Sequence, residues 1–163
     1  MWMFLMKNFS SPWLQIAKVS AKHLATLLQT HIGQTSSYIK VSGHFISKIS
    51  TLKRDPRDRL ISFDVVSLFT KVPINDTVTL IQQIFPEDIK TLFQHCLMTS
   101  YFQWYNEFYE QTDGVAMGSP LSPVIANFYI EQLEKQALAL APFAPTVWFW
   151  YVDDPFAIWN HSE

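Results

Sequence analysis

Two adjacent aspartates, Asp153 and Asp154, stand between apolar stretches in the segment WFWYVDDPFAIW, and a third, Asp64, lies inside LISFDVVSLF. An acid in such surroundings either is satisfied by backbone amides or a turn, or is held beside a cation. If a sheet brings Asp64 beside the other two, their oxygen atoms suit two Mg²⁺ (or Mn²⁺) ions. Two such ions serve in-line phosphoryl transfer, in which a hydroxyl attacks a phosphate.

Other chemistries lack their signatures in this sequence. It contains no His/Cys cluster with zinc spacing, no Walker-type or G-x-G-x-x-G loop and no serine nucleophile elbow. One cysteine, Cys96, excludes an internal disulfide and indicates a reducing compartment. No apolar run reaches the roughly 18 residues of a membrane span, and no signal peptide is recognisable. We therefore expect an intracellular protein, in the nucleus or cytoplasm, that does not bind membranes.

The net charge of −2 conceals an asymmetry. Residues 1–60 contain nine Lys or Arg against two Asp, whereas residues 61–163 contain three Lys against twelve Asp or Glu. A basic half joined to an acidic half suits a protein that binds anions through one part and cations through the other. Two ordinary solvated faces are the alternative interpretation.

The hydrophobic periodicity and the turn residues predict a single α+β domain. The first expected elements are a helix from Ser11-Pro12 that stops by Gly33 and a short helix after Ser42. A polar turn over 53–59, a strand over 60–66 and helices over 73–85 and from Pro86 follow. The last elements are a hairpin over 101–111 with Asn106-Glu107 at its turn, a helix from near Pro120 to before Pro142, and a strand–turn–strand over 146–159.

Three stretches, FDVVSLF, GVAMGSPLSP and YVDD, resemble in order and spacing the palm motifs A, B and C of reverse transcriptases. DGVAMGSPLSPVIAN at 113–127, with VSLFTKVPI and LATLLQTHIGQTSSYIK, resembles most closely the Penelope-like retroelements. The resemblance covers residues 16–161. It implies a partial right-hand polymerase palm, an antiparallel sheet with a catalytic hairpin and helices packed on one face, plus a helical part of the fingers. Residues 1–59 would be partial, basic fingers and residues 60–163 the palm.

The resemblance also implies a role for individual residues. Asp64 and Asp153 would be the principal catalytic metal ligands, with Asp154 as a third carboxylate. Phe69 would lie against the sugar of the incoming dNTP and exclude a 2′-hydroxyl, and its alternative is an ordinary core position. The other expected contacts are Gln111 and Gly118 to the nucleotide, and Ser119, Pro120, Lys40, Lys48, Lys53 and Arg54 to an RNA template and DNA primer. For Ser119 and Pro120 the alternative is an ordinary helix cap, and for the lysines and the arginine it is a solvated surface charge. Nothing in the sequence indicates a protein partner.

The sequence departs from the family pattern in three respects. Trp150 stands where a basic residue is usual, and Pro155 stands where Thr or a similar residue is usual. The chain ends soon after the hairpin, whereas the family continues with a further palm strand and a thumb, and often with an endonuclease. We therefore expect a truncated fragment of a retroelement reverse transcriptase that adds nucleotides to a primer 3′-hydroxyl. The alternative hypotheses are a relic or repurposed fragment that binds nucleic acid without catalysis, and a two-metal nuclease or phosphatase, against which GVAMGSPLSP speaks.

Overall fold

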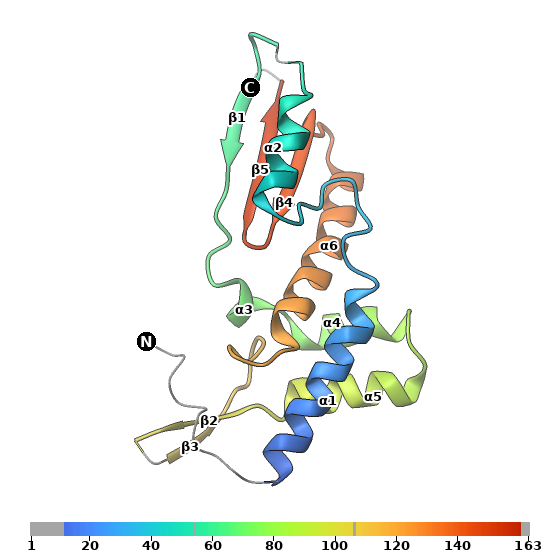
Figure 1. The fold of residues 1–163 in the computed structure, drawn as a ribbon, viewed down its shortest axis with the longest axis vertical. Helices are drawn as coiled ribbons and strands as arrows, with labels where there is room; N and C mark the ends of the chain where they lie inside the picture. The colour runs from blue at the N-terminus through green and yellow to red at the C-terminus, as the bar shows by residue number, and fades with distance from the viewer. Residues whose placement is uncertain (1–11, 54, 106, 161–163) are drawn as a thin grey trace. The chain divides into compact units, whose positions relative to one another are not determined.

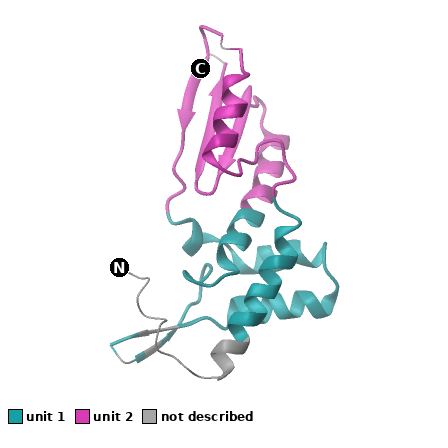
Figure 2. Cartoon of the chain, viewed as in Figure 1, with its two compact units in different colours: residues 1–32, 67–129 teal, residues 33–66, 130–163 magenta. Residues whose placement is uncertain are grey.

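The chain folds into two compact units, each made of two separate segments (Figure 2). The structure, a computed structural model, describes residues 12–53, 55–105 and 107–160, and gives only the backbone of residues 12–16, 102, 103 and 108. Unit 1 comprises residues 1–32 and 67–129, and unit 2 comprises residues 33–66 and 130–163.

Unit 2 is built on a three-stranded antiparallel sheet in the order β1–β5–β4 (Figure 1). In the β4–β5 hairpin Tyr151 pairs with Asp154, and β1 pairs with β5 so that Ser62 lies opposite Phe156. This hairpin confirms the strand–turn–strand predicted over 146–159, and the mixture of helices with an antiparallel sheet confirms the α+β class. The strands are β1 (Arg59–Ser62), β4 (Val147–Tyr151) and β5 (Asp154–Trp159).

Helix α2 (Ser42–Ser50) packs on one face of this sheet through aromatic contacts. The Phe45 ring stands edge-on to Phe149 and Phe156, with centroids 6.1 and 5.2 Å away. Phe149 and Phe156 are themselves opposite one another in the β4–β5 register and stack at 6.5 Å. Such aromatic pairs add to the free energy gained by burying the rings. The cluster fixes α2 against the middle of the hairpin.

The outer edge of β4 is covered by residues 37–39. The Trp150 N–H donates to the Ser37 carbonyl and the Ile39 N–H donates to the Trp150 carbonyl, each over 2.9 Å. These bonds make a short parallel bridge between Tyr38 and Trp150. Both main-chain groups of Trp150 are therefore used at this edge and not in the ladder with β5.

Unit 1 is mainly helical and has an apolar core that includes Ile81, Phe93 and Phe128. The first helix buries Ala21, Leu24, Ala25 and Leu28, the spacing of one helical face. Among the described residues, no helix is both long and apolar enough to cross a membrane. The helices are α1 (Pro12–Gln29), α4 (Ile74–Gln82), α5 (Glu87–Met98) and α6 (Ser122–Leu140), the last of which continues into unit 2.

The predicted hairpin over 101–111 is confirmed, with its turn shifted by one residue. Strand β2 (Tyr101–Trp104) pairs with β3 (Glu107–Glu110), and Glu107 lies opposite Trp104 inside the ladder. Tyr105, with a φ of +48°, therefore belongs to the turn. Asn106, predicted at the turn, lies outside the described residues.

Two further predictions differ from the structure. The strand expected over 60–66 ends at Ser62, and the chain then forms the unpredicted short helix α3 (Leu68–Lys71). Ser67 has a φ of +63°, so the extended chain turns there and Leu68 becomes buried. Helix α6 begins at Ser122, slightly later than the start predicted near Pro120.

The loop that follows β3 is docked on α3 through its backbone. The Val115 N–H donates to the Phe69 carbonyl over 2.7 Å. Gly114 has a φ of +70°, and a Cβ atom at this position would lie 2.5 Å from both the Phe69 carbonyl oxygen and Thr70 Cα. Only glycine fits so close an approach of two backbones in this conformation. Phe69, the last residue of FDVVSLF, is thereby brought into contact with the GVAMGSP segment within unit 1.

Gly114→Ala is expected to lower the free energy of unfolding by about 2–4 kcal/mol. A left-handed non-glycine residue costs about 1–3 kcal/mol, and overlap with the backbone of α3 adds to it. Urea unfolding followed by circular dichroism measures the change. Gly43→Ala is the matched control, because nothing lies within 4 Å of a Cβ there. In helix α2 that change should be neutral or stabilising, and equal stability of the two variants would contradict the prediction.

Candidate active site

The Asp153-Asp154 pair lies at the tip of the β4–β5 hairpin. A two-residue turn, Val152 and Asp153, joins Tyr151 to Asp154, the first residue of β5. Asp153 is half-buried and Asp154 is exposed. Val152 has a φ of +55°, an unfavourable conformation for a β-branched side chain. A strained residue thus stands directly before the first aspartate.

Asp64 lies beside this turn, because the β1–β5 register continues past the end of β1. The Phe63 N–H donates to the Pro155 carbonyl and the Val65 N–H donates to the Asp153 carbonyl, each over 3.0 Å. The same register sets Asp64 opposite Asp154, between these two hydrogen-bonded pairs. Residues opposite one another without mutual hydrogen bonds have the closest Cα atoms of an antiparallel ladder. The structure therefore brings the backbones of all three predicted catalytic residues together within unit 2.

This arrangement is electrostatically unfavourable unless a cation is bound. Like charges directly opposite one another destabilise a strand pair, and Asp64 and Asp154 are both exposed carboxylates. Exposure also excludes the alternative that Asp64 is a buried acid satisfied by backbone amides. Carboxylate oxygens are the donors that Mg²⁺ and Mn²⁺ take, so the residues fit such ions chemically. In this structure, however, the described residues contain no group of three His, Cys, Asp or Glu side chains close enough together to hold a metal ion.

The early end of β1 has a physical cause in Pro155. In an antiparallel ladder the pair of Phe63 and residue 155 would exchange two hydrogen bonds. Proline has no N–H, so the bond returned to the Phe63 carbonyl cannot form. The strand ladder is interrupted at the residue before Asp64, although the chain continues alongside the hairpin to Val65.

Trp150, the second departure from the family pattern, contributes to the turn. Its buried indole Nε1 donates to the Val152 carbonyl. A basic side chain at this position would not supply the same planar, apolar group with a single donor. The indole thus holds the strained residue directly before Asp153.

The family model described as reverse transcriptase (RNA-dependent DNA polymerase) matches residues 11–163. The chain belongs to this family. Reverse transcriptases bind an RNA template and a primer and use divalent metal ions for nucleotidyl transfer, and their palm has the mixed helical and antiparallel architecture seen here.

One solved structure similar to this reverse transcriptase chain is apo telomerase from Candida tropicalis, truncated from the C-terminal domain. It is 14% identical, with a TM-score of 0.49, and the match covers 91% of this chain. The present chain spans 34% of the length of that protein. The search of curated proteins gave no match.

The residues predicted to contact the nucleotide lie in unit 1. Phe69 is a half-buried residue of α3, and its carbonyl receives the Val115 N–H. Gln111 is braced within the loop, since its side-chain amide donates to the Asp113 carbonyl over 2.9 Å. Gly118 has a φ of +96°, and no atom lies within 4 Å of the position of a Cβ. The requirement for glycine at 118 is therefore conformational, and its surroundings are open.

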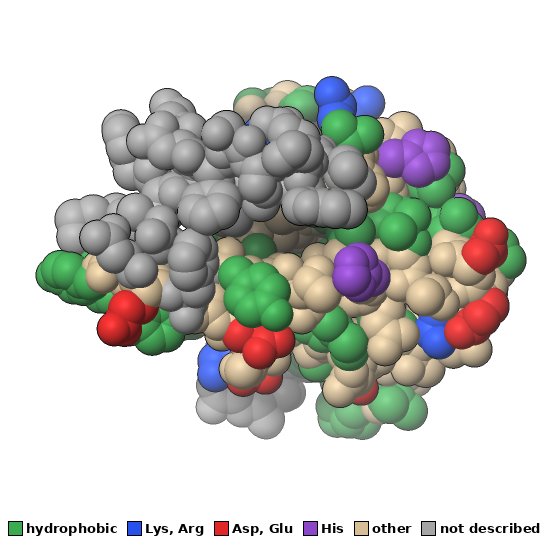
Figure 3. Space-filling model, turned by 90° about the horizontal axis from the view of Figure 1, so that it is seen from below, with side chains coloured by type: hydrophobic (Ala, Val, Ile, Leu, Met, Phe, Trp, Pro, Cys, Tyr) green, Lys and Arg blue, Asp and Glu red, His purple; other side chains and the backbone are tan. Residues whose placement is uncertain are grey.

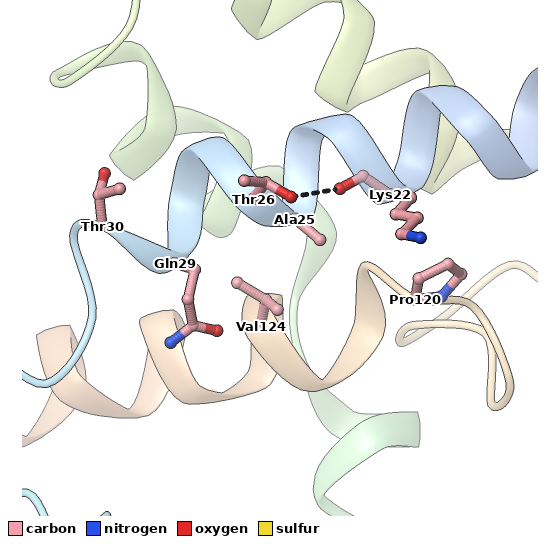
Figure 4. A pocket seen from close by; sticks show the side chains of 7 residues that line it. All are labelled: Lys22, Ala25, Thr26, Gln29, Thr30, Pro120 and Val124. Atoms are coloured by element: carbon pink, nitrogen blue, oxygen red, sulfur yellow. Dashed lines mark hydrogen bonds between the residues drawn. The ribbon is translucent and has the colours of Figure 1, made fainter.

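Ser119 and Pro120 precede helix α6, and Pro120 lines a groove. The Ser119 hydroxyl accepts a bond from the Leu121 N–H over 3.3 Å, as a helix-capping residue does. The groove has a volume of about 490 Å³ and lies within unit 1 (Figure 4). Lys22 and Pro120 stand at one end, and Gln29 and Thr30 toward the other. Its lining residues are Lys22, Ala25, Thr26, Gln29, Thr30, Pro120 and Val124.

The predicted phosphate-binding cations of the first 60 residues differ in their surroundings. Lys40 and Lys53 are exposed in unit 2, whereas Arg54 lies outside the described residues. The ammonium of Lys48 donates to the Ser36 carbonyl and lies 5.0 Å over the Phe149 ring, so it is engaged within the unit. On the face seen in Figure 3, the coloured Lys and Arg side chains lie in places beside acidic ones. Of the three described lysines among the predicted cations, Lys40 and Lys53 are thus the exposed ones.

The sequence interpretation did not single out Lys22 or the carboxylates of α6. Lys22, Thr26 and Gln29 recur at helical spacing, so a polar stripe on the first helix was a usable signal for the groove. Glu131 and Glu134 are buried, but nothing in the sequence around them distinguishes them from exposed helix residues.

Pro155→Thr is expected to increase the affinity for Mn²⁺ about fivefold. The restored N–H can donate to the Phe63 carbonyl, and a backbone hydrogen bond contributes about 1 kcal/mol to holding Asp64 beside the hairpin. Isothermal titration with Mn²⁺ measures the affinity. Pro142→Thr, which removes an exposed proline outside the ladder, is the control and should leave the affinity unchanged. An unchanged dissociation constant in Pro155→Thr would refute the prediction.

Proposed function

We propose that this chain is part of the polymerase core of a retroelement reverse transcriptase, closest to the Penelope-like group. The observation that carries the proposal is the backbone pairing of residues 63–65 with residues 153–155, which sets Asp64 beside Asp153 and Asp154. These are the three acids at the positions of motifs A and C. The reaction is the addition of deoxynucleotides to the 3′-hydroxyl of a primer on an RNA template.

Asp64 and Asp153 would hold two Mg²⁺ (or Mn²⁺) ions, with Asp154 beside them. When bound, the metal ions lower the pKa of the attacking primer hydroxyl and stabilise charge on the leaving phosphate oxygens. The protein's own contribution is to orient the carboxylates. The left-handed Val152 sets the direction of the turn, and the Trp150 indole fixes its carbonyl.

The contacts with the incoming nucleotide and with the template strand are assigned to residues of unit 1. The ring of Phe69 excludes a 2′-hydroxyl from the incoming nucleotide, and the open backbone at Gly118 lets the nascent base pair approach. Gln111 supports this loop through its bond to the Asp113 carbonyl. The groove that contains Pro120 suits a single template strand, since Lys22 offers a charge to a phosphate and Thr26 and Gln29 offer hydrogen-bonding groups.

We also propose the functional division that the motifs suggest. Residues 1–59 would serve as partial fingers and residues 60–163 as palm. In the fingers, Lys40, Lys53 and Arg54 would bind template or primer phosphates, and Ser119 and Pro120 would contact the template from the palm.

A second candidate function is nucleic-acid binding without polymerisation. The specific observation in its favour is that the three carboxylates do not converge among the described residues, while Pro155 interrupts the ladder beside them. In that case a labelled RNA–DNA hybrid would bind in a salt-dependent manner and would not be extended. Absence of binding at low salt would remove this candidate.

Asp153→Ala is expected to lower primer extension on an RNA template with Mn²⁺ by at least about 100-fold. Metal ions stabilise the transition state by several kcal/mol, and each 1.36 kcal/mol corresponds to about a factor of ten in rate. Asp88→Ala, an exposed acid in the first turn of α5, is the control and should retain the wild-type rate. Extension that persists in Asp153→Ala would point to a contaminating polymerase. No extension by the wild-type chain would favour the second candidate.

Phe69→Ala is expected to increase ribonucleotide incorporation relative to deoxynucleotides by about tenfold or more. Removing the ring relieves a steric clash with the 2′-hydroxyl, and such a contact contributes on the order of 1–3 kcal/mol to discrimination. Single-nucleotide extension with matched rNTP and dNTP measures the ratio. Phe63→Ala, an exposed ring of the other unit, is the control, and equal ratios in the two variants would contradict the role of Phe69.

A further inference from the structure

Glu131, in the part of helix α6 that belongs to unit 2, is a buried carboxylate that binds backbone far away in the sequence. Its Oε2 accepts the Gly33 N–H over 2.8 Å, and its Oε1 accepts the Gln34 N–H over 3.2 Å. The Lys135 ammonium lies 3.7 Å from Oε1 and is itself about half exposed. The side chain of Glu131 is only 5% exposed. Both of its oxygens are therefore committed to one turn.

The turn is shaped to receive a carboxylate. Gly33 has a φ of +76°, which directs its N–H and that of the following residue to the same side of the chain. A Cβ atom at this position would lie 2.9 Å from the Tyr38 ring. Glycine is thus required twice, by the backbone conformation and by the ring packed on it. The negative charge of Glu131 compensates the two donors that this conformation exposes.

Hydrogen bonds joined by short stretches of chain lead from this turn to the hairpin. The segment that begins at Gly33 pairs with Trp150 through Ser37 and Ile39. The Trp150 indole donates to the Val152 carbonyl. The residue that follows, Asp153, accepts the Val65 N–H with its own carbonyl. Each step lies within unit 2.

A second carboxylate of α6, that of Glu134, contacts the same segment through Ser37, and burial disfavours its charged form. Burial raises the pKa of the Glu134 carboxyl, and a side-chain hydrogen bond with Ser37 opposes this shift. Glu131 differs because two backbone N–H groups donate to it, whereas the Lys135 ammonium acts on both carboxylates. The segment is also held by the Lys48 ammonium at the Ser36 carbonyl. Of the side chains named here, only Glu131 is a buried carboxylate that accepts hydrogen bonds from two consecutive backbone N–H groups.

We propose that Glu131 is a positioning residue for the metal-binding hairpin. By fixing the turn at Gly33 and Gln34, it seats residues 37–39 on the edge of β4 and so holds Trp150 and the Val152-Asp153 turn in place. As a statement about catalysis this rests on the proposed function of the hairpin. The structural part of the proposal does not rest on that function, because it predicts how well the hairpin is held in place when no metal is bound.

Amide hydrogen exchange of the metal-free full chain tests the proposal. In E131Q one acceptor is lost and a donor is placed against the turn, so the amides of Ile39, Trp150 and Val65 should exchange at least about tenfold faster than in the wild type. Val65 is the decisive probe, because its N–H donates to the Asp153 carbonyl at the far end of this series. The Phe93 amide, in the core of unit 1, should be unchanged and thereby excludes global unfolding as the cause.

Two further variants complete the design. K135A removes the half-exposed ion pair but leaves both oxygens of Glu131 on the turn, so it should not alter exchange at Val65. E131D keeps the charge but shortens its reach, and it should show the same pattern as E131Q with a smaller increase if E131Q does not fold. Mn²⁺ affinity should fall by about tenfold in E131Q, the lower end of the range for groups that orient metal ligands.

The outcomes separate the two proposals. Faster exchange at Ile39 with an unchanged Val65 amide would mean a purely local structural role and would overturn the inference. Faster exchange at Phe93 to the same extent would also overturn it, because the effect would then be global. If Val65 responds as expected but neither the wild type nor Asp153→Ala binds Mn²⁺, the positioning role stands and the proposed function of the hairpin fails.

Discussion

Two backbone hydrogen bonds, from Phe63 to Pro155 and from Val65 to Asp153, are the interaction on which the candidate active site depends. They bring together acids that are about 90 positions apart in the sequence, against their mutual repulsion. Hydrogen bonds between backbones are indifferent to side-chain charge, so a sheet can hold like charges together that free side chains would not approach. The repulsion that results would be relieved by a bound divalent cation, as the proposed function requires.

The local elements were largely predictable from the sequence, and the long-range contacts were not. The face of α1 that carries Leu24 and Leu28 has a period that only a helix produces, and the hairpin around Asp153 follows from two aromatic strands and a turn. The end of β1 was missed because the residue that interrupts it, Pro155, is on another strand and acts through a register that the sequence does not reveal. Helix α3 was missed because four residues give no periodicity, and the contact of Glu131 with Gly33 spans too long a stretch of chain for any local pattern.

For the candidate site too, the sequence predicted the individual residues but not the contacts that hold them. Family motifs singled out Asp64, Asp153 and Asp154, and the structure adds the backbone pairing that relates them. The supporting residues were invisible because they act by hydrogen bonds to main-chain atoms, for which many side chains would serve. Val152 illustrates the cost of such a site, since a β-branched residue in a left-handed conformation is unfavourable by about 1–3 kcal/mol and persists only where its surroundings fix it. The Trp150 indole and the strand pairing on both sides of the turn provide that constraint.

The division of each unit into two chain segments has a consequence for the order of events during synthesis. Residues 33–66 have their partners in residues 130–163, so β1 and the segment at 37–39 leave the ribosome long before the strands with which they pair. The second segment of unit 1, residues 67–129, is synthesised between them. Contacts between such distant residues are slow to form because a long loop has to close first. In a nascent chain the backbone of β1 therefore lacks its partner β5 for most of translation, and the period before β5 emerges is when aggregation or capture by a chaperone competes with folding.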